Sequence, residues 1–211
     1  NSENQVRKKI ARRFTVIGPS FNFNVYVDSL PVTVSDRDFY QNLEFIWPIN
    51  INPSAFGHDV CPNVKDFRQI IGHIKGVTQY KVTGWIGSVE NTKLLSEDKA
   101  RGITDNKIIL LARGKLVQEN ILEQFNIGSI YAKYLIGEIN ADFLDIDEAD
   151  DIATSNRQSV IEDDPRYQEL IEYVFEILQG IKKDWENWRI GLATQKAIDE
   201  FPVLNEWYKK L

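Results

Sequence analysis

The stretch Ile108 to Gln118, IILLARGKLVQ, decides the fold predicted for this chain. Its first half, Ile108 to Ala112, is a nearly continuous apolar run, as expected of a strand that is buried on both faces. Arg113, Gly114 and Lys115 interrupt the run with a polar turn, and Lys115 to Gln118 then resumes as a strand. The stretch therefore predicts two strands joined by a short basic turn.

Two further strands are predicted on either side of this pair. Gln79 to Glu90 and Tyr134 to Phe143 both alternate apolar and polar residues, which at a period of two gives each strand one apolar face. Gly84 and Gly87 lie inside the first of these segments, without the Gly-Lys-Ser/Thr that completes a phosphate loop. We interpret them as a structural feature of a strand. Asn91 to Asn106 is polar and charged, which predicts an exposed loop.

The N-terminal third mixes shorter signals. Residues Gln5 to Arg13 form a basic lead-in, and Phe14 to Val34 predict a hairpin that turns at Asp28 to Pro31. Ser35 is placed to cap a short helix from Asp36 to about Phe45. The three prolines between Trp47 and Pro62 favour a connection, and Val64 to Ile74 fits a short helix.

The C-terminal third is predicted to be helical. Apolar residues from Leu170 to Leu178 recur at helical spacing, which predicts a long amphipathic helix from Pro165 to around Arg189. A second helical segment, Gly191 to Leu211, is interrupted at Pro202. The chain is therefore predicted to be an α+β protein with a mixed sheet, divided into a linker (1–13), an α+β domain (14–162) and a helical segment (163–211).

Composition limits the classes of function. No apolar run approaches the roughly 20 residues that span a bilayer, so we expect no membrane insertion. A single cysteine, Cys61, favours the reducing cytoplasm. The net charge of −6 argues against broad phosphate binding, but it does not exclude phosphate binding by a local cationic patch. The absence of Met predicts either a piece cut from a longer protein or a sequence from which modified methionines are left out.

Several local patterns have ordinary structural interpretations that we favour. His58, Cys61 and His73 are too few for a typical structural zinc site, and the six carboxylates between Asp142 and Asp151 fit a solvated loop better than a calcium loop. Trp185 and Trp188 fit packing on one helix face. The basic lead-in (Arg7, Lys8, Lys9, Arg12 and Arg13) gives nucleic-acid contact as a minor hypothesis beside a solvated linker.

Two segments carry a family resemblance. Ala112 to Val117 is similar in pattern to a strand turn of mismatch-repair ATPases, and Asp150 to Gln158, DDIATSNRQ, is similar to a loop of heat-shock chaperones. From Ile10 to about Arg189 the chain resembles the transducer region of the GHKL superfamily of ATPases, the gyrase, chaperone, histidine-kinase and mismatch-repair type. Arg113 and Lys115 replace the family's Asn and Arg, and the chaperone loop's Pro is absent.

The resemblance implies a fold and a function. It implies a ribosomal-protein-type transducer fold with a left-handed βαβ crossover, in which Arg157 reaches the γ-phosphate of ATP as a catalytic and nucleotide-binding residue. By turn position, Arg113 and Lys115 are further nucleotide contacts. The chain alone would be inactive and hold no cofactor, whereas the parent protein would bind ATP and Mg²⁺. Implied partners are an upstream ATPase domain in cis, a second copy, and a nucleic-acid or protein client.

Other hypotheses stay open beside this one. The chain could be a self-contained module that binds nucleic acid or protein through its basic arm or its tryptophan-bearing helices. A weaker hypothesis is a nuclease that uses the carboxylates of Asp142 to Asp151 with Mg²⁺. Arg157 itself has an alternative role as an ion-pair partner of the neighbouring carboxylates.

Overall fold

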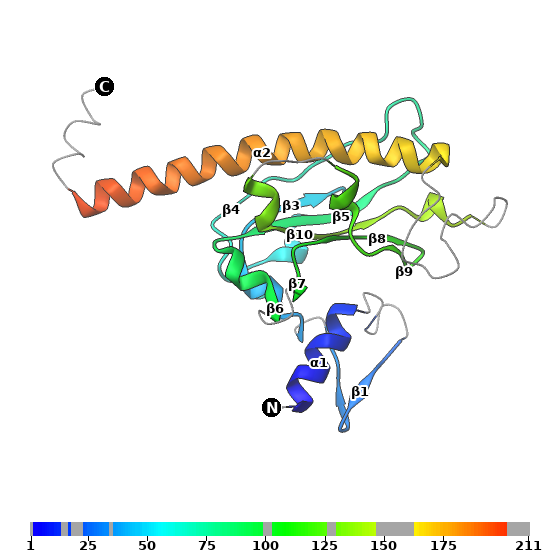
Figure 1. Cartoon of the computed structure of the whole chain (residues 1–211), viewed down its shortest axis with the longest axis horizontal. Coiled ribbons are helices and arrows are strands. Elements are labelled where there is room, and N and C mark those ends of the chain that lie inside the picture. Colours follow the sequence, from blue (N-terminus) through cyan, green and yellow to red (C-terminus); the bar gives the residue numbers. More distant parts are fainter. Residues whose placement is uncertain are drawn as a thin grey trace.

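Figure 1 shows the computed structural model, which describes residues 2–13, 17, 23–33, 36–98, 103–125, 130–146 and 163–201. Its body is a six-stranded sheet in the spatial order β4-β3-β5-β10-β8-β9. The strands are β3 (Leu43–Ile49), β4 (Asp66–Phe67), β5 (Thr83–Val89), β8 (Ile108–Ala112), β9 (Lys115–Gln118) and β10 (Leu135–Asn140). Strand β10 runs antiparallel to β5 and parallel to β8. The predicted α+β class with a mixed sheet is thus confirmed, and the left-handed crossover stays a prediction.

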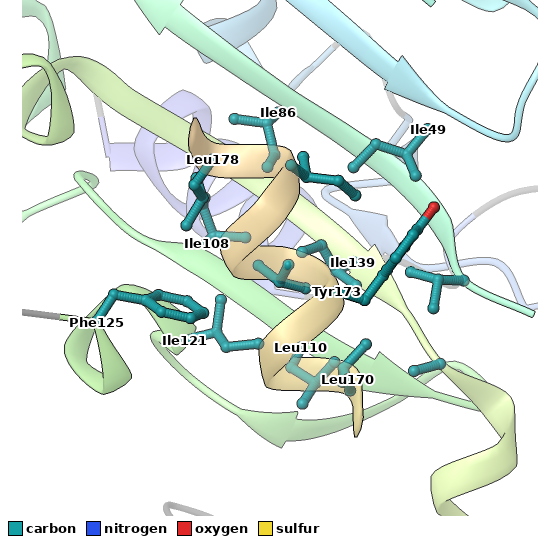
Figure 2. Close-up of a cluster of buried hydrophobic side chains, with 14 of the residues drawn as sticks. Ile49, Ile86, Ile108, Leu110, Ile121, Phe125, Ile139, Leu170, Tyr173 and Leu178 are labelled. Atoms are coloured by element: carbon teal, nitrogen blue, oxygen red, sulfur yellow. The ribbon is translucent and has the colours of Figure 1, made fainter. Parts of the chain in front are cut away.

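Helix α2 (Pro165–Glu200) covers one face of this sheet. Its buried residues follow helical spacing, and Figure 2 shows Leu170, Tyr173 and Leu178 directed at isoleucines and leucines of the strands. The Asp164 side chain accepts a hydrogen bond from the backbone N–H of Arg166, and Pro165 occupies the first turn, a favourable helix start. The helix therefore begins where the sequence predicts.

The helix is longer than predicted, because Gly191 does not interrupt it. It continues to Glu200 and ends just before Pro202, consistent with the steric restriction on the residue that precedes a proline. At 1.5 Å per residue, 36 residues span about 54 Å, and Figure 1 shows the C-terminal half extending past the sheet. No helix in the described ranges is both long and apolar enough to cross a membrane.

The opposite face of the sheet carries a second core. Phe39, Tyr40, Ile46 and Trp85 belong to it, and the ring centroids of Phe39 and Trp85 are 5.6 Å apart. Short elements surround this face: the 3-10 helices η3 (Asp38–Asn42), η4 (Pro53–Phe56) and η5 (Thr92–Leu95), and the small sheet of β6 (Ser96–Asp98) and β7 (Ile103–Thr104). Three more 3-10 helices are η6 (Ile121–Gln124), η7 (Ile130–Tyr134) and η8 (Asp142–Leu144). Both faces of the sheet are therefore covered.

Glycine is required where β5 and β10 approach each other. Gly84 has φ of +141°, and a Cβ at this position would lie 2.1 Å from the backbone oxygen of Glu138. Since no side chain fits at that distance, the interpretation of Gly84 as a strand feature is confirmed.

Three segments differ from the prediction. Residues 91–106, predicted to be an exposed loop, contain η5 and the sheet of β6 and β7, and Leu95 and Asp105 in this segment are buried. Residues 43–49 form the fully buried strand β3, where the sequence predicted a helix end and a connection. A strand that is buried on both faces lacks the alternation of apolar and polar residues by which a strand is recognised in a sequence. Pro48 made the segment harder still to recognise as a strand. Residues 64–74 are extended and not helical: β4 and the bridge between Ile49 and Ile70 run parallel to β3.

A smaller unit lies beside the body. It consists of helix α1 (Ser2–Arg13) and the hairpin of β1 (Tyr26–Val27) and β2 (Leu30–Pro31). Its small core contains Ala11, Ile17 and Val32. The basic lead-in is therefore helical, and the hairpin turns at Asp28 and Ser29 as predicted. The proposed division of the chain into three parts stays a prediction.

Candidate nucleic-acid interface

Helix α1 concentrates positive charge. Its sequence, SENQVRKKIARR, has five cations and one carboxylate, and its straight-chain residues and alanine favour the helical conformation. Ala11 faces the small core. At 100° per residue, positions 9, 12 and 13 fall roughly 100° to 200° around the helix from Ala11. Positions 9, 12 and 13, called here the cationic side, therefore lie on a different part of the helix from Ala11.

Arg7 holds α1 against the hairpin. Its Nη2 atom donates to the backbone oxygen of Pro31 at 2.7 Å and to Oδ2 of Asp36 at 2.8 Å. The same Asp36 oxygen accepts from the backbone N–H of Thr33 at 2.8 Å. Arg7 and Asp36 are both mostly buried, so the pair is screened less than a surface ion pair. This arginine is therefore a structural anchor of the helix.

A second arginine ties α1 to the sheet. Arg37 donates through Nε to the backbone oxygen of Ala11 at 2.8 Å and through Nη1 to Oε1 of Glu138, on β10, at 3.4 Å. The carbonyl of Ala11 is one of the last four in the helix, which lack helical partners. Burial raises the pKa of Glu138, and the charge of Arg37 opposes this shift. Arg37 therefore fixes the position of the cationic helix relative to the body.

The predicted nucleotide contacts lie elsewhere. Arg113 and Gly114 have φ of +48° and +74° and form the tight turn between β8 and β9. The Arg113 backbone N–H donates to Oδ1 of Asp142 at 2.6 Å, and Nζ of Lys115 lies 3.0 Å from Oδ2 of Asp145. The structure therefore brings the basic turn together with the start of the acidic segment. Arg157 lies outside the described residues, and the nucleotide role of all three residues stays a prediction.

Sequence reasoning missed a partly buried ionic contact at the other end of the sheet. Arg189 of α2 donates to Oε2 of Glu44 at 2.7 Å and to the Val89 backbone oxygen at 2.9 Å. Its guanidinium lies 4.7 Å from the ring centroid of Tyr134 and 4.8 Å from that of Trp185, within cation–π range. These contacts hold α2 against the sheet. Trp185 contributes by packing against the Arg189 guanidinium.

His58 and Cys61 line a cavity of about 350 Å³ between η4 and β3, together with Phe56, Val64 and Phe67. Burial raises the pKa of the Cys61 thiol to about 11, which keeps it protonated at neutral pH and lowers its reactivity. Within the described ranges, no three His, Cys, Asp or Glu side chains form a group that could hold a metal ion.

Comparison with known proteins gives one relative. Over 190 residues the chain is 36% identical to a protein of Herpetosiphon aurantiacus named "Putative type II restriction enzyme HgiDII". The match covers 90% of this chain and 30% of that protein, so the chain spans less than a third of the relative's length. No protein-family model matches the chain, and no solved structure matches it significantly.

This comparison corrects the functional prediction. The predicted assignment to the transducer region of a GHKL ATPase, with its chaperone-like and mismatch-repair-like roles, is wrong, because the relative is named as a restriction enzyme. The resemblance depended on the order of the predicted elements from Ile10 to about Arg189 and on two short polar segments, 112–117 and 150–158. Such short polar segments recur in unrelated proteins because turn geometry itself selects their residues. The alternative of a nucleic-acid-binding module agrees better with the relative.

Proposed function

We propose that this chain is a DNA-binding module of a restriction-enzyme-like protein, and that the cationic side of α1 contacts the phosphate backbone. The observation that carries the proposal is the 36% identity to the Herpetosiphon protein across 90% of the chain. Restriction implies a DNA partner, and under this proposal the chain works in the cytoplasm. Because the chain spans 30% of that protein, we assign binding to it and not strand cleavage.

The charge distribution supports α1 as the contact surface. The whole chain has a net charge of −6, so its overall charge does not favour association with DNA. Helix α1 is locally cationic, and each Lys or Arg that replaces a phosphate counterion contributes to binding. The two anchors, Arg7 and Arg37, hold the helix in a fixed orientation, which reduces the entropy cost of binding.

The test is duplex binding measured by fluorescence anisotropy across a salt series. The proposal predicts that the logarithm of the association constant falls linearly with the logarithm of salt concentration. Lys9→Ala combined with Arg13→Ala removes two cations and should reduce the magnitude of this slope by about 2. The matched control, Lys183→Ala combined with Lys196→Ala, removes the same charge from exposed positions of α2.

The control should leave both affinity and slope nearly unchanged. Equal losses in the two double variants would show that total charge, and not α1, governs binding. A wild-type chain that does not bind duplex DNA at low salt would reject the proposed function.

A further inference from the structure

The cavity between η4 and β3 also borders β4, the edge strand of the sheet. Residues from all three elements line it: Ile46 and Pro48 of β3, Phe56 of η4 and Phe67 of β4. Its volume of about 350 Å³ lies near the lower end of the range that is typical of small-molecule sites. The cavity is therefore a feature of the tertiary fold, with room for a small ligand.

The walls of this cavity are held in place by contacts outside it. The ring centroid of Phe56 lies 6.2 Å from that of Tyr40 and 6.0 Å from that of Trp85. On the other side, Nε2 of Gln69 donates to the backbone oxygen of Ile51 at 2.9 Å, which joins the segment after β4 to the segment before η4. Because the walls are already ordered, a ligand that enters loses little binding energy to their ordering.

The lining is apolar in its depth and polar at its mouth. None of the residues that line the cavity is Asp, Glu, Lys or Arg, so a charged ligand would lose its hydration without gaining an ion pair. Ile46 and Cys61 are buried, whereas Ser54 and His58 are exposed. Within the described part of the chain, neither of these two polar side chains forms a hydrogen bond with another residue. The lining thus suits a neutral ligand with an apolar body and one polar edge.

We propose that this cavity binds a small planar heteroaromatic molecule, of about the size of an indole. The flat faces of such a molecule match the rings of Phe56 and Phe67, because aromatic rings attract each other in offset or edge-to-face arrangements. Its polar edge faces Ser54 and His58, whose side chains can each donate or accept a hydrogen bond. The site shares no residue with α1, so it does not depend on the proposed function.

The experiment is titration of the whole chain with indole, followed by amide NMR spectroscopy of isotopically labelled protein. Indole should bind saturably with a dissociation constant of about 1 mM or below, and the shift changes should centre on residues 54–58 and 64–67. Cyclohexanol, which is similarly small but not planar, should bind about 10-fold more weakly. A titration without saturation by indole, or equal binding of cyclohexanol, would overturn the proposal.

Substitutions locate the site. Phe67→Ala, at a 55% exposed position of β4, should weaken indole binding by about 10-fold, and Ser54→Ala combined with His58→Ala should weaken it by about 3-fold. Phe175→Ala, a matched control at a 46% exposed position of α2, should keep wild-type affinity, and thermal unfolding checks that all variants fold. Equal affinities of the Phe67→Ala and Phe175→Ala variants would show that indole binds elsewhere. Unchanged affinity in the Ser54 and His58 double variant would reject recognition of the polar edge.

Discussion

The sheet body and the α1–hairpin unit are stabilised in different ways. The body has a continuous core in which Trp47, Ile86, Leu170 and many others are nearly inaccessible. Among the residues that the structure describes, the unit buries Ala11, Ile17 and Val32, with Ile10, Val25 and Val27 packed against them. Burying an apolar side chain contributes about 1.5 to 3 kcal/mol, whereas ordering a residue's backbone costs about 1 to 2 kcal/mol. The unit therefore depends on its polar anchors to the body, while Tyr26 and Leu30 of its hairpin are exposed.

The largest expected effect comes from breaking the link between the two regions. Arg37→Ala removes the hydrogen bond to the Ala11 carbonyl and leaves Glu138 buried without its guanidinium partner. We expect the free energy of unfolding to fall by about 3 to 5 kcal/mol, measured by urea denaturation.

A matched arginine provides the control. Arg68 is half-exposed and pairs with Asp184 at 2.8 Å, so Arg68→Ala should cost at most about 1 kcal/mol. Adding Glu138→Leu to Arg37→Ala removes the buried charge and should recover part of the loss. Equal losses for the two arginine variants would contradict the role of Arg37 as the link.

Two core substitutions, one in each region, test whether the body and the α1–hairpin unit differ in stability. Leu170→Ala opens a cavity in the body core and should lower the free energy of unfolding by about 2 to 5 kcal/mol. Val32→Ala in the unit should cost about 1 to 2 kcal/mol, with faster amide hydrogen exchange confined to α1 and the hairpin. Faster exchange throughout the sheet in Val32→Ala would show that the two regions unfold as one.

The smallest effect concerns acid stability. The hydrogen bond from Arg166 holds the pKa of Asp164 below its ordinary value. A depressed carboxyl pKa contributes stability above the pKa of the unfolded chain, and this contribution is lost as pH falls toward the folded value. Asp164→Asn keeps the helix cap but should flatten the decline in thermal stability below about pH 4. An unchanged acid profile would show that this carboxylate makes no such contribution.

The sequence predicted most strands of the body correctly. β5, β8, β9 and β10 each have a local signal, either period-two alternation or a short apolar run. It failed at β3, because a strand covered on both faces loses its alternation and Pro48 is typical of a connection. The pairing of residues 66–67 with β3 was also missed, since two residues carry too little pattern to indicate a strand.

The candidate site was predicted only in part. The cations of α1 are visible in the sequence and gave a minor hypothesis, against which the net charge of −6 was weighed. The anchors were not predictable, because Arg37 and Glu138 are 101 residues apart and their contact has no local pattern. The exposure of Tyr26 and Leu30 likewise depends on what else packs nearby.

By itself the sequence determined the α+β class, four strands, the turn at Asp28 and Ser29 and the start of α2 at Pro165. Each of these depends on periodicity, turn chemistry or capping, which act over a few neighbouring residues. Only the tertiary structure decided the order of the strands, the position of β3, and the partners of Arg37 and Arg189. The Arg189–Glu44 contact joins residues 145 positions apart. Contacts at that separation form only when the chain collapses around its core, so the orientation of the cationic helix is a property of the fold and not of its own sequence.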